Sequence, residues 1–169
     1  MSKTVEQTKR LTICAMMAAV SVVLMLLGAV LQLGTYAAPL LTGMLLIPIG
    51  NRCGRKYQGM LWLVISVLCF MLIPAAEQNM MFAGLFGWYP IAYPTLQKLP
   101  RLMRLPVKLL LFNGVVIAME ALLLWVIAPE AMELGMVLLL LALGNVTFLL
   151  YDYLIPKTEL ILRRIMKLK

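Results

Sequence analysis

The sequence predicts an all-α integral membrane protein: a compact bundle of six transmembrane helices with short loops and both termini in the cytoplasm. Of its 169 residues, 63% are hydrophobic and only 13% are charged. A soluble globule of this size has too little interior to bury so much apolar surface. The apolar residues form six stretches, and the cations lie before the first stretch, between alternate stretches and after the last. Composition, segmentation and charge sorting therefore all indicate a lipid bilayer.

The first three predicted spans carry no charged residue. Residues 11–33 are long enough, at about 1.5 Å per helical residue, to cross a hydrocarbon core of about 30 Å. They lack the small-residue cleavage pattern of a signal peptide, so we expect a retained span. Residues 36–49 are short and contain Pro39 and Pro48, which predicts a span that thins the bilayer, tilts little or breaks near its ends. Residues 57–73 form the third span.

The fourth predicted span, residues 80–96, contains two glycines and two prolines: Gly84, Gly87, Pro90 and Pro94. A membrane helix tolerates such breakers where neighbours or a cavity satisfy the freed carbonyls, so this span is a candidate cavity wall. Residues 107–128 and 135–155 form the fifth and sixth spans. The tail, residues 156–169, is either an amphipathic turn on the inner leaflet or a plain extension of the sixth helix. With no internal repeat or boundary, residues 1–169 are expected to form one domain.

The loop charges predict the orientation. Every cation falls at one end of the six spans, and by the positive-inside rule that end is cytoplasmic. The charged residues of the opposite loops are all acids: Glu77, Glu130 and Glu133. We therefore expect a multi-pass protein of the cell membrane with both termini inside. The sorted cations are Lys3, Lys9, Arg10, Arg52, Arg55, Lys56, Lys98, Arg101, Arg104, Lys108, Lys157, Arg163, Arg164, Lys167 and Lys169.

Several kinds of chemistry are excluded by the composition. The chain has no histidine, so it has no imidazole for a zinc site, a nucleophile pair or a proton shuttle. The three cysteines form no CxxC motif and are best interpreted as apolar fillers: Cys14, Cys53 and Cys69. The glycine-containing residues 50–56 do not match a Walker A loop. We expect no catalytic residues, metal, cofactor or nucleic-acid partner.

Spans five and six each carry two polar residues seven positions apart, which places each pair on one stripe of its helix. If the stripes face each other, Asn113 and Glu120 form a polar ladder with Asn145 and Asp152. An intramembrane acid is functional by default, so Glu120 is the leading ligand contact. The alternative is a neutral Glu120 bonded to Asn145, and the asparagines alone are most often helix-to-helix contacts. For Asp152, which is expected close to Lys108 and Arg104, we expect a structural ion pair at the inner interface.

Aromatic and outer polar residues complete the predicted site. Trp88 and Tyr89 lie at about the depth of Glu120 and could stack on a planar ligand, or simply pack beside small residues. Trp62 is interpreted as an interfacial belt residue. Five polar residues in the outer connections could form a lid over an outward-facing pocket, or could simply face water: Gln32, Thr35, Tyr36, Gln78 and Asn79.

The first span carries Ala15 and Ala19, a small-xxx-small pair extended by Ala18, which would let another helix approach closely. Packing within the chain is the alternative. With the basic start Lys9-Arg10, the stubby second span, six short spans and minimal loops, the chain resembles the S components of energy-coupling factor (ECF) vitamin transporters.

That resemblance implies a subunit that binds a vitamin or other micronutrient from outside, near the outer face. It implies docking through Ala15 and Ala19 on a transmembrane coupling subunit that carries two ATPases, and a toppling motion that exposes the pocket inward. The chain lacks the His-rich start of nickel and cobalt members and the signatures of riboflavin, thiamine and biotin members, so the substrate stays open. The alternatives are a scaffold resembling MreD-type cell-shape proteins and a proton-coupled transporter that uses Glu120.

Overall fold

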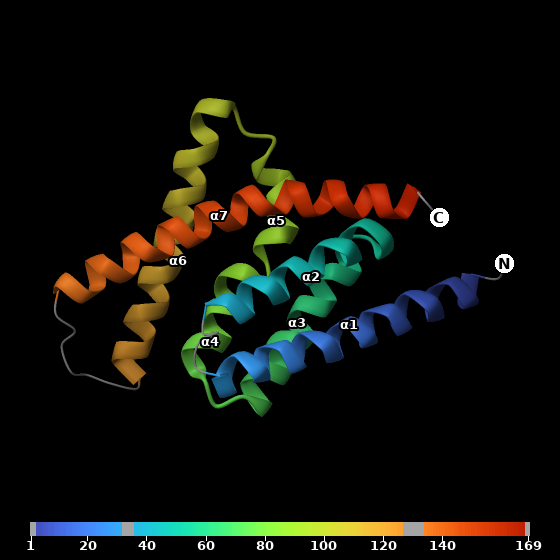
Figure 1. Ribbon diagram of the computed structural model, residues 1–169, viewed down its shortest axis with the longest axis horizontal. Coiled ribbons are helices and arrows are strands. Elements are labelled where there is room, and N and C mark those ends of the chain that lie inside the picture. Colours follow the sequence, from blue (N-terminus) through green and yellow to red (C-terminus); the bar gives the residue numbers. More distant parts are fainter. Residues whose placement is uncertain (1–2, 32–35, 127–133, 168–169) are drawn as a thin grey trace. The chain divides into compact units, whose positions relative to one another are not determined.

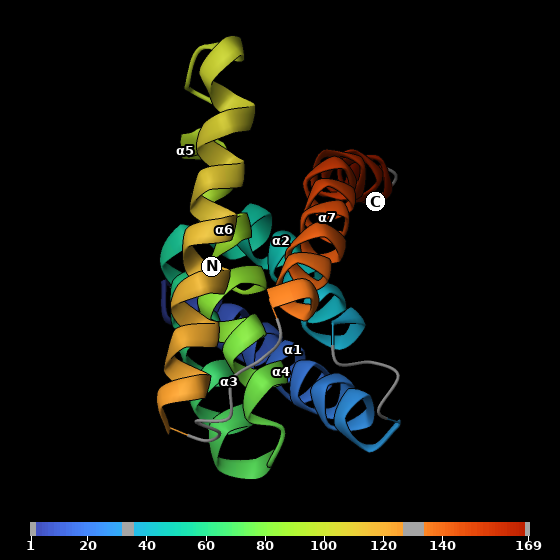
Figure 2. The same cartoon turned by 90° about the vertical axis from the view of Figure 1, so that its left-hand side faces the viewer.

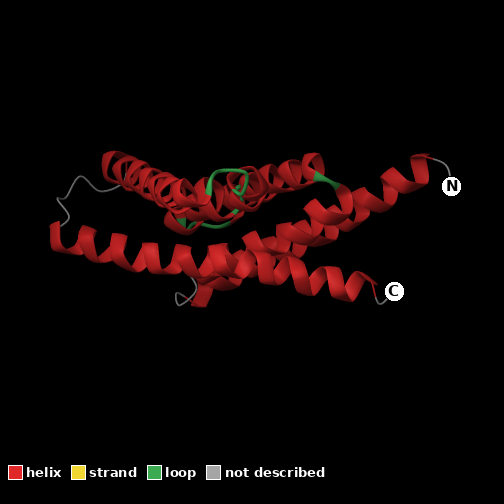
Figure 3. Ribbon diagram, turned by 90° about the horizontal axis from the view of Figure 1, so that it is seen from above, coloured by secondary structure: helices red, strands yellow, loops and turns green. Residues whose placement is uncertain are grey.

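A computed structural model describes residues 3–31, 36–126 and 134–167, with side chains throughout except at 3, 4, 120, 123–126, 134–140, 162, 163 and 165–167. Within the described residues every element is a helix, as predicted (Figure 3). The elements follow the chain as Figure 1 labels them: α1 (Lys3–Leu31), α2 (Ala37–Cys53), α3 (Arg55–Leu72), α4 (Ala76–Met81), the π-helix η1 (Phe82–Phe86), α5 (Tyr89–Leu96), α6 (Arg101–Val126) and α7 (Leu134–Lys167).

Within the residues that the structure describes, three helical segments are long and apolar enough to cross a membrane: Val5–Leu31, Arg55–Leu72 and Arg101–Met119. Large apolar side chains also lie on the outside of the long helices, among them Met71, which is 78% exposed, and Leu110, which is 77% exposed. In water such faces would have to be covered, whereas lipid tails solvate them. The helical class and the membrane character agree with the sequence, and the six-span count and the orientation stay predictions.

The chain divides into two compact units, Met1–Ile91 and Ala92–Lys169, which are described separately. In the first unit α1, α2 and α3 all pack against one another (Figures 1 and 2). Their shared core contains Met25, Leu46 and Ile65, all completely buried. α1 and α3 expose apolar residues on the faces that point away from this core, whereas α2 is buried or partly buried along most of its length.

The second helix is longer than its predicted span. α2 passes through Pro48 without a break and ends at Cys53, beyond the expected end at Ile49. The turn into α3 is made by Gly54, whose φ of 97° lies in the left-handed region that favours glycine. α2 and α3 are therefore joined by a sharp corner of one residue.

The fourth span is broken, as the glycines and prolines predict. It begins at Ala76, earlier than the expected Met80, and changes from α-helix to π-helix at Phe82. The π-turn closes with a bond from the Gly87 N–H to the Phe82 carbonyl, and α5 then begins at Tyr89. Three short helical segments, α4, η1 and α5, therefore replace one straight helix.

In the second unit α7 crosses α6 (Figure 1). Phe112 of α6 stacks on Phe148 of α7 with ring centroids 4.6 Å apart. Gly144 allows this approach, because a Cβ there would lie 3.3 Å from the Phe112 ring. α7 continues through Pro156 to Lys167, so the tail extends the sixth helix, which was one of the two predicted alternatives.

Candidate functional site

The crossing of α6 and α7 holds an asparagine pair. The Asn113 side-chain amide donates to Asn145 Oδ1 at 3.1 Å, and the Asn145 amide donates to Asn113 Oδ1 at 2.9 Å. Each amide donates its second N–H to a carbonyl of its own helix: Asn113 to Leu109 at 2.9 Å, and Asn145 to Leu141 at 2.7 Å. All four amide N–H groups are thus engaged, and only oxygen lone pairs remain for a further contact.

This closed pair limits what the asparagines can do. A ligand bound by Asn113 or Asn145 would have to donate a hydrogen to an amide oxygen or displace the pair. Likewise, both amide hydrogens of Asn145 are engaged, so Asn145 has none left to donate to an ionised Glu120 carboxylate. A protonated Glu120 could instead donate its hydrogen to the Asn145 amide oxygen. The Glu120 side chain lies outside the described residues. The geometry favours helix-to-helix contact as the role of the two asparagines.

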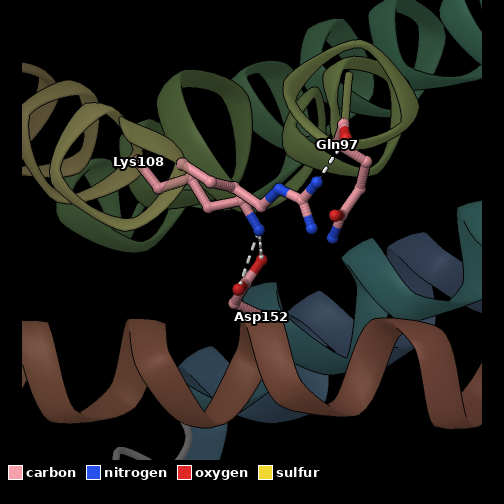
Figure 4. A network of polar contacts seen from close by, with 4 residues as sticks. Gln97, Lys108 and Asp152 are labelled. Carbon is pink, nitrogen blue, oxygen red and sulfur yellow. Dashed lines mark hydrogen bonds and ion pairs between the residues drawn. The ribbon is translucent and has the colours of Figure 1, made fainter. Parts of the chain in front are cut away.

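Farther along the same two helices, Asp152 makes the predicted ion pair. Lys108 Nζ donates to both carboxylate oxygens of Asp152, at 2.6 and 2.9 Å (Figure 4). Lys108 is only 3% exposed, and its ammonium also lies 4.7 Å from the centre of the Tyr93 ring. A carboxylate and an aromatic face thus replace the water that a buried ammonium would lose.

Arg104 does not join this ion pair. Its guanidinium donates to the carbonyls of Gln97 at 2.7 Å and Leu99 at 3.2 Å. These carbonyls follow α5, where helix geometry leaves the last acceptors without intrahelical donors. Arg104 therefore fastens the end of α5 to the start of α6.

In the first unit, two predicted lid residues are interior. Gln78 and Asn79 are each 1% exposed. The Gln78 amide donates to the Met25 carbonyl of α1 at 2.6 Å, and the Asn79 amide donates to the carbonyls of Cys69 at 3.1 Å and Ile73 at 2.8 Å. Asn79 thereby supplies a donor to the Ile73 carbonyl just beyond α3 and a second donor to the Cys69 carbonyl, which also accepts from the Ile73 N–H; lipid could supply neither.

The side-chain oxygens of Gln78 and Asn79, unlike their amide nitrogens, have no hydrogen-bond partner among the described residues. Gln78 Oε1 and Asn79 Oδ1 are buried and accept no hydrogen bond in the described part of the chain. A buried acceptor without a donor costs about 1 to 3 kcal/mol, so a donor-bearing ligand or a water would be stabilised there. Close by in sequence, the Tyr36 hydroxyl donates to Glu77 Oε1 at 2.8 Å, joining the start of α2 to α4. Gln32 and Thr35 lie outside the described residues.

The aromatic pair of the fourth span is largely enclosed. Tyr89 is completely buried, and its ring meets that of Trp88 edge-on, with centroids 6.4 Å apart. The Trp88 indole N–H donates to the Gly84 carbonyl. In this conformation Tyr89 packs inside the protein, and only the partly exposed Trp88 could meet a ligand.

Trp62 is a contact that the sequence did not reveal. Instead of serving only as a belt residue, it donates from its indole N–H to the Ala83 carbonyl at 3.2 Å and lies against Gly87. A π-turn displaces the regular helical bonds, and these carbonyls need donors from elsewhere. Gly87 was the only sequence signal, because a tight approach to a glycine leaves room for a large ring.

The α1 alanines divide between two faces. Ala18 is buried in the first unit, whereas Ala15 and Ala19 are exposed together with Met16. Packing within the chain thus accounts for Ala18, and the exposed pair is free of the unit's core.

No group of three or more cysteines, aspartates and glutamates that could hold a metal ion occurs within the described residues. No family model matches the chain, and comparisons with curated proteins and with solved structures find no match either.

Proposed function

We propose that the chain is the substrate-binding S component of an ECF-type importer, which captures a small vitamin-like molecule outside the cell. A coupling subunit and two ATPases would deliver the molecule inward. The observation that carries the proposal is the exposed Ala15 and Ala19 edge of α1, on a candidate span whose Ala18 is turned into the protein. Small residues on an apolar helix allow a second membrane helix to approach closely. The predicted topology, with both termini in the cytoplasm, and the short loops support the same function.

The ligand chemistry follows from the acceptors. Gln78 Oε1 and Asn79 Oδ1 are buried and need donors, so the proposed ligand presents N–H or O–H groups to them. Trp88 offers a partly exposed ring for a planar part of such a molecule. Glu120, an acid in an apolar helix, remains the predicted contact in the second unit.

Gentle extraction from native membranes, followed by mass spectrometry of co-purifying proteins and small molecules, tests this function. We expect a coupling protein, two ATPases and a donor-bearing metabolite. Ala15→Leu should lose the partner proteins while retaining the metabolite, because a larger side chain prevents close helix approach. Met16→Leu, at an exposed neighbour, is the matched control and should retain the partners. Recovery of the wild-type chain without any ATPase would contradict the proposal.

One observation favours a second function, a six-span scaffold resembling MreD-type cell-shape proteins. The Asn113 and Asn145 amides satisfy each other and leave no N–H group for a ligand. A polar ladder that only holds helices together is what a scaffold requires. Thermal shift distinguishes the two, because a ligand stabilises the folded protein by RT ln(1 + [L]/Kd), whereas a scaffold without a pocket gains nothing from any metabolite pool.

A further inference from the structure

Two hydroxyl groups in the interior of the first unit differ from three other hydroxyls of the helices. Thr12, Ser66 and Thr147 each donate to the carbonyl four residues earlier in their own helix, at 2.9 Å. Ser21 and Thr42 are completely buried, yet their oxygens have no hydrogen-bond partner within the described residues. The bond to the preceding turn is the usual way to satisfy a hydroxyl in a helix. The Ser21 and Thr42 hydroxyls therefore need a partner from elsewhere.

Both hydroxyls border the same core. Ser21 lies one turn before Met25 on α1, and Thr42 lies one turn before Leu46 on α2. Residues four apart share a helix face. Met25 and Leu46 belong to one buried cluster, and α2 packs against α1 (Figure 1). The two hydroxyls thus come to one interior region from two helices.

A third oxygen reaches this region from α4. The Gln78 amide nitrogen donates to the Met25 carbonyl at 2.6 Å and lies 3.6 Å from the Met25 sulfur, one turn from Ser21 on α1. α4 also packs against α2. A carbonyl can only accept, so the amide nitrogen must face Met25 and the amide cannot be reversed. Gln78 Oε1 is therefore the atom that lacks a partner.

We propose that Ser21 Oγ, Thr42 Oγ1 and Gln78 Oε1 bind one alkali-metal cation, sodium or potassium, in the core of the first unit. Hard cations take oxygen ligands, and neutral oxygens can replace the hydration shell of a monovalent ion. A calcium ion would call for carboxylates, and the described residues contain no group of three acids or cysteines that could hold a metal ion. Three neutral oxygens from three helices therefore favour a monovalent ion.

The broken fourth helix suits such a site. Gln78 lies one turn before Phe82, where the α-helix changes to the π-helix. In membrane proteins, discontinuous helices supply coordinating groups for sodium ions, because their backbone is not fully paired within the helix. The proposed ion lies beside this kind of discontinuity.

The charges of the first unit also favour a cation. Glu77, a partly buried acid, directly precedes the glutamine ligand in α4. The nearest cations along α1 and α2 are Arg10 and Arg52, each at least ten residues, or about 15 Å of helix, from the proposed ligands. An acid is thus closer along the chain than any cation, and an anion would find no N–H donor among the three ligand atoms.

This inference does not depend on the proposed transport function, because it uses only contacts within the first unit. It is also compatible with that function. An amide oxygen has two lone pairs, so Gln78 Oε1 can bind the ion and still accept a hydrogen bond from the proposed ligand.

Thermal unfolding in different salts tests the inference. The full-length protein in detergent is dialysed, because the oxygens are buried, into sodium, potassium or choline chloride of equal ionic strength, with no metabolite added. An ion that binds only the folded protein stabilises it by mass action. At about ten times the dissociation constant, we expect sodium, potassium or both to raise the melting temperature by about 3 to 6 °C over choline. Equal melting temperatures in the three salts would overturn the proposal.

Three variants make the result specific. Thr42→Val and Ser21→Ala each remove one oxygen and should lose most of the rise. In choline, Thr42→Val should melt at or above the wild-type temperature, because it removes a buried oxygen without a partner, so lost binding is distinguished from a folding defect. Ser66→Ala is the matched control: its hydroxyl is bonded within α3, and it should keep the full rise. A full rise in either core variant, or a lost rise in Ser66→Ala, would contradict the proposed site.

Discussion

Lys108 illustrates how a charged side chain is accommodated in this protein. It is nearly inaccessible, and its ammonium is held by both oxygens of Asp152 and by the face of Tyr93. The sequence predicted an ion pair for Asp152, because Lys108 and Arg104 fall at the same end of the two apolar helices, and the structure shows Lys108 as the partner. It could not predict the aromatic contact, which depends on how the end of α5 is folded back by Arg104.

Removing the cation should be costly. We expect Lys108→Met to lower the free energy of unfolding by about 3 to 5 kcal/mol, because Asp152 is left as an unpaired, poorly hydrated charge. Thermal unfolding in detergent measures this change. The double variant Lys108→Met, Asp152→Leu should recover most of the loss, since neither charge is then left alone.

An exposed ion pair provides the control. Arg10 and Glu6 lie 3.9 Å apart one helical turn from each other on α1, with side chains 41% and 63% exposed. Glu6→Gln should change stability by about 0.5 kcal/mol or less, because water screens such pairs. Equal losses in Lys108→Met and Glu6→Gln would argue that the Lys108 pair is not shielded from solvent.

In the broken fourth helix, a glycine makes room for a tryptophan ring that donates a hydrogen bond to a carbonyl of the π-turn. η1 frees backbone carbonyls, the Trp62 and Trp88 indoles donate to two of them, and Gly87 leaves the space for the Trp62 ring. The sequence predicted the break from its glycines and prolines. It did not predict the π-turn, because the choice between α and π pitch depends on which side chains reach the freed carbonyls.

Adding a methyl group at Gly87 should destabilise the π-turn. A Cβ at Gly87 would lie 2.4 Å from Trp62 Cδ1 and 2.8 Å from the Phe82 carbonyl oxygen. We expect Gly87→Ala to destabilise the protein by about 1 to 3 kcal/mol, measured by thermal unfolding in detergent. Gly59→Ala is the matched control in α3, where nothing lies within 4 Å of the added carbon.

The control should behave in the opposite direction. Alanine at position 59 fits the helix and should raise stability by about 0.5 to 1 kcal/mol. A Gly87→Ala protein as stable as the wild type would show that the Trp62 ring can move aside, and that the π-turn does not depend on this contact.

For the whole molecule, the orientation rests on charge alone. Reporter fusions in a bacterial cell measure it: green fluorescent protein fluoresces only inside, and alkaline phosphatase is active only outside. By the positive-inside rule we expect fluorescence from fusions after residues 100 and 169, and phosphatase activity from fusions after residues 75 and 130. Phosphatase activity after residue 100 would contradict the six-span topology.

The sequence by itself determined the helical class, the membrane character, the broken fourth helix and an ion pair for Asp152. Hydropathy and charge act along each helix, so they can be interpreted without knowing its neighbours. Only the tertiary structure decided that Trp62 donates to the Ala83 carbonyl and that Gln78 is buried against α1. Those contacts depend on the rotation of each helix about its axis and on the π-turn. Both are set by the packing of side chains that lie far apart in the chain.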